Sequence, residues 1–260
     1  MNLKEMLVGL NGLKVKGSLD IDITNFDKDS RNIGENGLFI AIKGFESDGH
    51  DYVEDAIKQG AKAVVLQEAK KSIISKIPSD ITIIIAEDTR YALAICSCNF
   101  YGNPSRKFKL IGITGTKGKT TTSFMIKKIL EKTGKKVGLV GTIATYIGEK
   151  KLEDSDRTTP ESNKLQAIFA KMVDEGCEAV VMEVSSQSLK LNRVAGCDFD
   201  IGIFTNFSQD HISEKEHPDM EDYFNSKLRL FSMCKTAYIN SDDFYVAKLK
   251  MMDLPCEQKT

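Results

Sequence analysis

One turn in the sequence carries the residue types that bind phosphate groups. Residues 111–122, IGITGTKGKTTT, join an apolar strand-like segment to a helix-like one. Glycines let successive backbone N–H groups point at phosphate oxygens, and a helix N-terminus adds partial positive charge. We expect Lys119 to reach the β- and γ-phosphates of ATP and the Thr120 hydroxyl to bind Mg²⁺. The predicted ATP-binding residues are Gly115, Thr116, Lys117, Gly118, Lys119, Thr120 and Thr121.

This turn departs from the commonest nucleotide-binding pattern. The pattern G-x-x-x-x-G-K-[ST] needs glycine at position 113, where the chain has Ile113, and its glycines stand at 112 and 115 instead. The departure argues against a generic GTPase or kinase. The alternative interpretation is a glycine-rich turn that binds nothing, but Gly-Lys-Thr between a strand and a helix is uncommon in such turns.

Other polar residues follow apolar segments that are typical of buried strands. Glu183 follows residues 179–182, and Asn206 follows residues 201–204. Parallel sheets bind ligands at the carboxyl ends of their strands. Because Mg²⁺ prefers hard oxygen ligands, Glu183 is a candidate metal ligand beside the phosphates. An isolated glutamate is more often solvated or helix-capping, and the residues alone leave that alternative open.

A polar segment, DRTTPE at residues 156–161, precedes another helix-like stretch. Threonine oxygens accept hydrogen bonds from the free N–H groups of a first turn, and proline is tolerated there because its nitrogen has no hydrogen to donate. We therefore expect Thr159 to be the N-cap of this helix and Pro160 to lie in its first turn.

The first hundred residues alternate short apolar strands with helices. Strands are expected at residues 37–42, 63–66 and 81–85, and helices at residues 50–60 and 89–100. Asp88 can cap the second of these helices. A connection rich in Gly, Pro and Ser follows at residues 101–107, and such connections separate domains. We predict a small N-terminal α/β domain at residues 1–105.

A second run of strands and helices contains the phosphate-binding turn. Strands are expected at residues 110–114, 137–140, 179–182, 201–204 and 237–239, and helices at residues 119–132 and 223–231. Strands separated by helices predict a parallel sheet that is covered on both faces. The fold class is therefore α/β, with a mostly parallel, P-loop-like ATPase sheet at residues 106–260.

Composition excludes several classes of partner. The 36 Lys and Arg residues nearly balance the 37 Asp and Glu residues, so charge gives no reason to expect nucleic acid or an anionic membrane as a partner. No run of about 18 apolar residues is present, and the N-terminus does not have the pattern of a secretory signal. The six cysteines show no paired C-x-x-C spacing, which is typical of a reduced, cytoplasmic protein.

Residues 114–121, TGTKGKTT, resemble the ATP loop of the Mur ligases, the cytoplasmic amino-acid-adding enzymes of peptidoglycan synthesis. Folylpolyglutamate synthetases share the superfamily, but their loop typically reads GKGS where this chain has GKTT. Three further blocks resemble the group of Mur ligases that adds the third amino acid. They are DSR at residues 29–31, TTP at residues 158–160 and EVSS at residues 183–186.

The resemblance implies roles for single residues. Ser30 would contact the uridine diphosphate end of the substrate, and Asn206 would lie near the ATP phosphates. Lys227, in the amphipathic segment YFNSKLRLF, would react with CO₂ to form a carbamate that helps to hold Mg²⁺. Without the resemblance, Lys227 would be taken as a solvated helix lysine. The implied contacts of the muramoyl peptide are Thr158, Thr159, Ser185 and Arg193, and the implied metal ligands are Thr120, Glu183, His211 and Lys227.

The implied reaction joins a free amino acid to UDP-MurNAc-L-Ala-D-Glu at the cost of ATP. The D-glutamyl carboxylate attacks the γ-phosphate, and the amine of the amino acid displaces phosphate from the acyl phosphate. The sequence does not indicate which amino acid is added. Members of the family carry a C-terminal domain that we expect to be absent from these 260 residues. Two alternatives therefore stay open, a folylpolyglutamate-type ligase and an inactive nucleotide-binding fragment.

Overall fold

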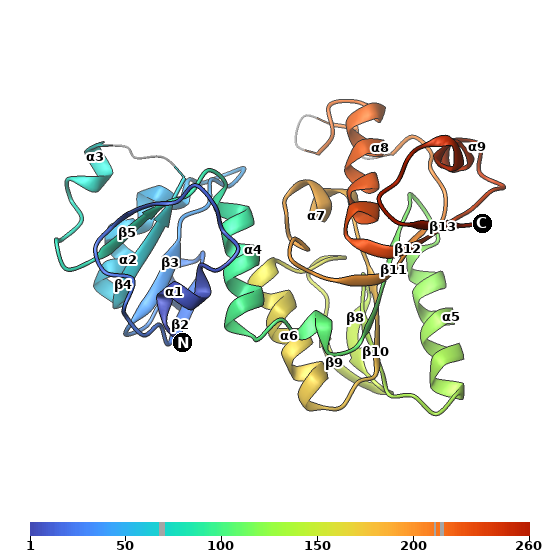
Figure 1. Ribbon diagram of the computed structural model, residues 1–260, viewed down its shortest axis with the longest axis horizontal. Coiled ribbons are helices and arrows are strands. Elements are labelled where there is room, and N and C mark those ends of the chain that lie inside the picture. The colour runs from blue at the N-terminus through green and yellow to red at the C-terminus, as the bar shows by residue number, and fades with distance from the viewer. Residues whose placement is uncertain (68–70, 211, 214–215) are drawn as a thin grey trace. The chain divides into compact units, whose positions relative to one another are not determined.

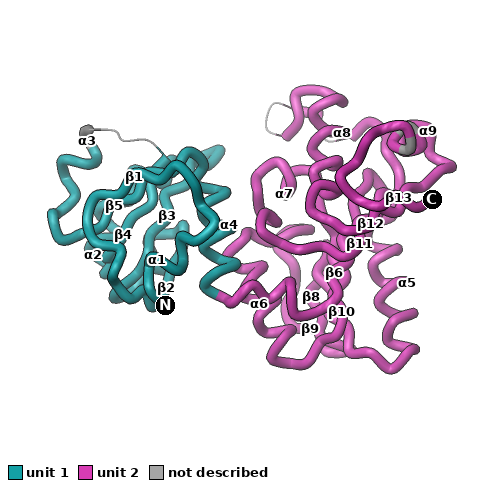
Figure 2. Tube along the Cα trace, viewed as in Figure 1, with its two compact units in different colours: residues 1–100 teal, residues 101–260 magenta. Residues whose placement is uncertain are grey.

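The computed structural model describes the chain except for residues 68–70, 211 and 214–215 (Figure 1). Two compact units make up the protein, Met1–Phe100 and Tyr101–Thr260 (Figure 2). The turn-rich connection at residues 101–107, where the sequence placed the domain boundary, belongs to the second unit.

The first unit is built on a five-stranded sheet in the order β1-β5-β4-β3-β2. Its strands are β1 Lys14–Lys16, β2 Asn25–Asp27, β3 Gly37–Ile40, β4 Ala61–Leu66 and β5 Thr82–Ile85, and its helices are α1 Leu3–Met6, η1 Ser30–Asn32, η2 Gly49–Tyr52, α2 Val53–Gln59, α3 Lys71–Ile74 and α4 Thr89–Phe100. Strands β2 to β5 are parallel, and β1 is antiparallel to β5. The predicted cap of α4 is confirmed, because the Asp88 carboxylate accepts from the N–H groups of Arg90 and Tyr91.

The second unit contains an eight-stranded sheet in the order β13-β12-β11-β6-β10-β7-β8-β9. Its strands are β6 Lys109–Thr114, β7 Val137–Val140, β8 Ala144–Ile147, β9 Lys150–Asp154, β10 Ala179–Glu183, β11 Phe199–Phe204, β12 Cys234–Ile239 and β13 Glu257–Lys259. All neighbours are parallel except β8, which is antiparallel to β7 and to β9. The predicted mostly parallel sheet is confirmed, and the β8–β9 hairpin is an addition that the sequence analysis missed.

Helices cover both faces of this sheet, as predicted (Figure 1). They are η3 Pro104–Arg106, α5 Lys119–Lys132, α6 Ser162–Asp174, α7 Ser186–Lys190, α8 Met220–Leu228, η4 Arg229–Ser232, α9 Phe244–Ala247 and η5 Lys248–Met251. Helix α5 packs Ile126 and Leu130 against Ile111, Ile113 and Val181 on one face. Apolar side chains of α6, α7 and α8 form the larger core on the other face. Alternate residues of the buried strands therefore serve opposite cores.

Strand β6 lies in the middle of the sheet, between β10 and β11. Its register pairs Ile113 with Glu183 and Thr114 with Phe204. The three strands therefore end side by side, and the loop after β6 lies between the segments that follow β10 and β11. Close packing holds β6 in place, because a Cβ atom at Gly112 would lie 2.6 Å from the Phe199 ring and 3.1 Å from Leu230.

Substitution Gly112→Ala is expected to destabilise the second unit by about 1–3 kcal/mol, because an added methyl group overpacks a buried strand. Phe199, whose ring the added methyl group would meet, is 1% exposed. Chemical denaturation followed by circular dichroism measures the change. Lys109→Ala, an exposed position on the same strand, is the control, with an expected change within about 1 kcal/mol. Equal stability of Gly112→Ala and the wild type would contradict the packing described here.

Candidate active site

The loop between β6 and α5 has a backbone conformation that requires glycine at two positions. Gly115 has φ +144°, and a Cβ atom there would collide with the Thr205 hydroxyl group. Gly118 has φ +82° and is the N-cap of α5. Both φ values lie in the region that side chains strongly disfavour. The loop can therefore pass close to residues 205–206 only because it is glycine-rich.

Asn206 holds this loop by its side-chain amide. Its Oδ1 accepts from the Lys117 N–H at 2.9 Å, and its Nδ2 donates to the Lys117 carbonyl at 2.9 Å. The Thr116 N–H donates to the Asn206 carbonyl at 3.0 Å, and the Thr205 hydroxyl also donates to the Lys117 carbonyl, at 2.8 Å. Asn206, which the family resemblance implied to lie near the ATP phosphates, thus fixes the backbone on both sides of Lys117.

Two lysines meet at the carbonyl oxygen of Gly115. Lys119 Nζ donates to it at 2.9 Å and to the Thr116 carbonyl at 3.1 Å, while Lys227 Nζ donates to it at 3.0 Å. Lys227 lies on α8, is 1% exposed and lies 4.4 Å from the centre of the Tyr223 ring. It is therefore not the solvated helix lysine that its sequence alone would suggest.

Burial and the nearby Lys119 ammonium lower the pKa of Lys227 to about 7, although Asp210 acts in the opposite direction. Burial also lowers the pKa of Lys119, against the attraction of Glu183 and Asp210. Both effects have the same origin, because low-dielectric surroundings and like charges disfavour an ammonium ion. A large fraction of Lys227 is thus a neutral amine near neutral pH.

The Glu183 carboxylate lies at the carboxyl end of β10 and is 1% exposed. Its Oε2 accepts from the hydroxyl groups of Thr120, at 2.9 Å, and Thr142, at 3.0 Å, and its Oε1 accepts from the Thr142 N–H at 2.9 Å. A hydroxyl and a carboxylate in contact, next to a phosphate loop, suit Mg²⁺, which keeps several water and phosphate ligands of its own. Within the described part of the chain, no cluster of three or more His, Cys, Asp or Glu residues is present. His211, the other predicted ligand, lies outside the described residues.

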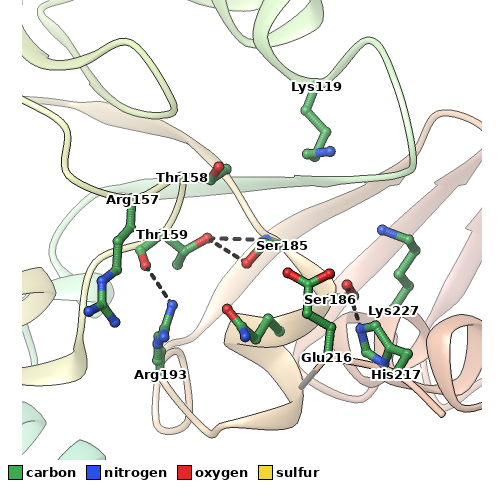
Figure 3. A pocket seen from close by; sticks show the side chains of 11 residues that line it. Lys119, Arg157, Thr158, Thr159, Ser185, Ser186, Arg193, Glu216, His217 and Lys227 are labelled. Carbon is green, nitrogen blue, oxygen red and sulfur yellow. Dashed lines mark hydrogen bonds between the residues drawn. The ribbon is translucent and has the colours of Figure 1, made fainter. Parts of the chain in front are cut away.

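A cavity of about 290 Å³ opens beside Lys119 and Lys227 within the second unit (Figure 3). It brings together all four residues that the sequence analysis assigned to the peptide substrate, and Lys119 of the predicted phosphate-binding residues. The residues that line it are Lys119, Arg157, Thr158, Thr159, Ser185, Ser186, Gln187, Arg193, Glu216, His217 and Lys227.

The Thr159 hydroxyl is bound at the carboxyl end of β10 and does not cap a helix. Its hydroxyl donates to the Glu183 carbonyl at 2.9 Å and accepts from the Ser185 N–H at 3.1 Å. Helix α6 begins at Ser162, with Glu161 as its N-cap. The predicted N-cap at Thr159 is therefore wrong, because this hydroxyl is engaged by the segment after β10.

The cavity carries net positive charge near Arg193. Arg193 is 5% exposed, and its Nε lies 3.0 Å from Glu161 Oε1. Arg157 Nη1 donates to the same oxygen at 2.6 Å, so one carboxylate faces two guanidinium groups. An anionic ligand is therefore favoured on this side of the cavity.

Ser30 lines a different cavity, of about 640 Å³, within the first unit. Lys28, Arg31, Tyr52 and Arg90 also line it. The Ser30 side chain is largely buried, whereas Arg31 is exposed and pairs with Asp29 at 2.6 Å. An aromatic ring among cations suits a ligand with a planar group and phosphates.

His217 is a residue of the cavity that the sequence analysis did not single out. It is 0% exposed, and its ring nitrogens contact Asp222 and Ser186. A single histidine between Glu216 and Pro218 has no periodicity or motif that would indicate burial. The burial of His217 results from contacts with elements that are distant in sequence.

Two family models match the chain, the Mur ligase middle domain at residues 113–254 and the Mur ligase family catalytic domain at residues 22–99. The chain belongs to the Mur ligase family. Two curated Mur ligases from Clostridium perfringens and Clostridium tetani, each named UDP-N-acetylmuramoyl-L-alanyl-D-glutamate--2,6-diaminopimelate ligase, are each 49% identical to it. They match over 96% and 94% of this chain and over 50% of their own lengths. The chain thus spans about half the length of these relatives.

Solved structures agree on the fold of this Mur ligase chain. A structure of UDP-N-acetylmuramoyl-L-alanyl-D-glutamate--2,6-diaminopimelate ligase matches 99% of this chain and 51% of its own, with a TM-score of 0.82 and 22% identity. A crystal structure of MurF from Acinetobacter baumannii matches 96% of this chain and 51% of its own, with a TM-score of 0.65 and 17% identity. No helix in the described part of the chain is long and apolar enough to cross a membrane.

The lowered pKa of Lys227 predicts a stability that depends on pH. Its pKa is about 7 in the folded chain and near its ordinary value of 10.5 in the unfolded chain. Between these values the unfolded chain binds more protons, so the free energy of unfolding rises with pH. From about pH 7 to about pH 9, the wild type should gain about 2 kcal/mol more than Lys227→Met. Chemical denaturation at both pH values measures this, and equal gains would contradict the burial of an ionisable amine.

Proposed function

We propose that this chain binds Mg·ATP and UDP-MurNAc-L-Ala-D-Glu and serves to join a third amino acid to the D-glutamyl residue in peptidoglycan synthesis. The observation that carries the proposal is that Lys119 and Lys227 both bind the Gly115 carbonyl of the phosphate loop and both line the cavity. A phosphoryl group on the loop would therefore face the ligand in the cavity. Such an arrangement suits the transfer of phosphate to a carboxylate, followed by attack of an amine on the acyl phosphate.

In this proposal the loop residues bind and orient the triphosphate. The backbone N–H groups of residues 115–120 and the start of α5 would contact the phosphates, and Lys119 would leave the Gly115 carbonyl to pair with them. Thr120 and Glu183 would hold Mg²⁺, which would offset negative charge on the transferred phosphoryl group.

The opposite wall of the cavity would bind the peptide part of the substrate. Arg193 would pair with a carboxylate, and the hydroxyl groups of Thr158 and Ser185 would contact polar groups beside it. Ser30, in the first unit, would contact the uridine diphosphate end. The relatives at 49% identity are named for 2,6-diaminopimelate, which is therefore the first amine to test. The same names favour this substrate over a folate.

Lys227 is proposed to be carbamylated. A neutral amine attacks CO₂, a C–N bond forms, and one proton is released to give a carbamate anion. Burial of the amine beside Lys119 favours the neutral form that this reaction needs. The resulting anion would add a hard oxygen ligand to those of Thr120 and Glu183.

Lys119→Ala is expected to weaken Mg·ATP binding by about ten- to a hundredfold, because hydrogen bonds to charged groups contribute about 1.5–3 kcal/mol. The matched control is Lys117→Ala, which removes an exposed lysine of the same loop and leaves the backbone contacts of Asn206 intact. Isothermal titration calorimetry measures both affinities. Equal losses in the two variants would mean that only general positive charge is involved, and unchanged affinity of Lys119→Ala would reject the phosphate loop.

Carbon-13 NMR with labelled bicarbonate tests the carbamate. The wild-type chain should give a carbamate resonance that is absent from Lys227→Ala and from Lys227→Arg, since neither variant offers a neutral amine. Lys127→Ala is the control, because Lys127 is also buried but pairs with Glu131 at 2.5 Å. A carbamate resonance that persists in Lys227→Ala would remove Lys227 from the proposal.

A further inference from the structure

A chain of hydrogen bonds runs behind one wall of the cavity, from Asp222 on α8 through His217 to Ser186 at the start of α7. His217 Nδ1 lies 2.6 Å from Asp222 Oδ2, and its Nε2 lies 2.9 Å from Ser186 Oγ. Figure 3 shows His217 and Ser186 side by side at the cavity that Lys119 and Lys227 also line. The mechanism proposed above uses none of these three side chains.

The chemistry of the three groups fixes where the protons lie. The Asp222 carboxylate also accepts from Lys190 Nζ at 2.7 Å, so it is ionised and has no proton to give. Nδ1 of His217 must then carry the hydrogen of the Asp222 contact. Burial lowers the pKa of His217, although the bond to Asp222 opposes this, so the ring is neutral near pH 7 and Nε2 is an acceptor. The Ser186 hydroxyl therefore donates its only hydrogen to Nε2.

This arrangement makes Ser186 a hydrogen-bond acceptor and the adjacent Ser185 a hydrogen-bond donor toward a ligand. Because the Ser186 hydroxyl donates its hydrogen to His217, its oxygen can only accept a hydrogen bond from a ligand in the cavity. Ser185 Oγ instead accepts from the Ser188 N–H at 3.1 Å, as the N-cap of α7, and lies as an acceptor 3.5 Å from Thr159 Oγ1, so the Ser185 hydroxyl hydrogen can be donated to a ligand. Ser185 suits a ligand carboxylate, and Ser186 suits a ligand N–H group.

The cations of the cavity cannot satisfy an N–H group. Lys119, Arg157 and Arg193 are donors only, and they would bind the phosphates and carboxylates of the substrate. The peptide bond between L-Ala and D-Glu brings an N–H group into the same space, and a desolvated donor without an acceptor is costly. This N–H belongs to the residue whose side-chain carboxylate must face Lys119.

We propose that Ser186 Oγ, held as an acceptor by His217 and Asp222, binds the N–H of the L-Ala–D-Glu peptide bond and so determines specificity for a peptide substrate. The inference rests on the proposed function, which supplies the ligand. Ser186 contacts the substrate in this proposal, and His217 is a positioning residue that acts through it. The same three residue types activate a nucleophile in serine hydrolases, but an acyl phosphate route needs no covalent enzyme intermediate.

The test compares UDP-MurNAc-L-Ala-D-Glu with its ester analogue, in which an oxygen atom replaces the N–H of the L-Ala–D-Glu bond. Calorimetric titration of the 260-residue wild-type chain should show about tenfold weaker binding of the ester, the factor for one lost hydrogen bond. Ser186→Ala should bind both ligands with affinities within about twofold of each other. Gln187→Ala, the neighbouring cavity residue outside the hydrogen-bond chain, should keep the tenfold preference for the amide.

The other outcomes of this titration distinguish failure of the inference from failure of the proposed function. A tenfold preference that persists in Ser186→Ala, or no preference in the wild type, would overturn the inference and leave the proposed function standing. Failure of the wild type to bind either ligand would overturn the proposed function, and the inference with it. Nitrogen-15 NMR of the histidine ring gives a second check that needs no variant to fold. His217 should be protonated at Nδ1 alone at neutral pH, and a proton on Nε2 would overturn the inference.

Discussion

The carbonyl oxygen of Gly115 accepts hydrogen bonds from two buried lysines, and the rest of the site depends on this contact. Lys119 comes from the first turn of α5 and Lys227 from α8, so one backbone atom ties two helices to the end of the central strand. Two ammonium groups at one oxygen repel each other, and burial removes the water that would screen them. The same geometry therefore keeps Lys227 partly neutral and holds Lys119 at the carbonyl groups of Gly115 and Thr116.

The parallel sheet explains why the other polar groups meet at this point. Strands β6, β10 and β11 are neighbours, so the loop after β6, Glu183 and Asn206 share one edge of the sheet. Asn206 then fixes the loop backbone, and Glu183 binds the hydroxyl groups of Thr120 and Thr142. Each of these contacts joins segments about 40 to 90 residues apart. The order of the strands therefore brings the site residues together, and local sequence determines only which residue types follow each strand.

Features set by local sequence could be predicted, whereas features set by strand order could not. Helix α5 at Lys119–Lys132 and strand β7 at Val137–Val140 were predicted at their observed bounds, because local periodicity and glycine turns determine them. The β8–β9 hairpin was missed, since its short, half-polar strands depend on pairing with β7. The cap at Thr159 was mispredicted because its hydroxyl binds the backbone at the end of β10. The burial of His217 depends on contacts with α7 and α8. Local sequence does not contain such contacts.

In the proposed function, the phosphate loop and the cationic cavity serve a single reaction. A crystal structure of the chain with UDP-MurNAc-L-Ala-D-Glu, Mg²⁺ and a non-hydrolysable ATP analogue would show whether they do. We expect the γ-phosphate to bind at residues 115–120 and the D-glutamyl side-chain carboxylate to enter the cavity between Lys119 and Arg193, within about 3.5 Å of the γ-phosphorus. A nucleotide on the loop with the peptide bound away from this cavity would show that the loop and the cavity do not serve one reaction.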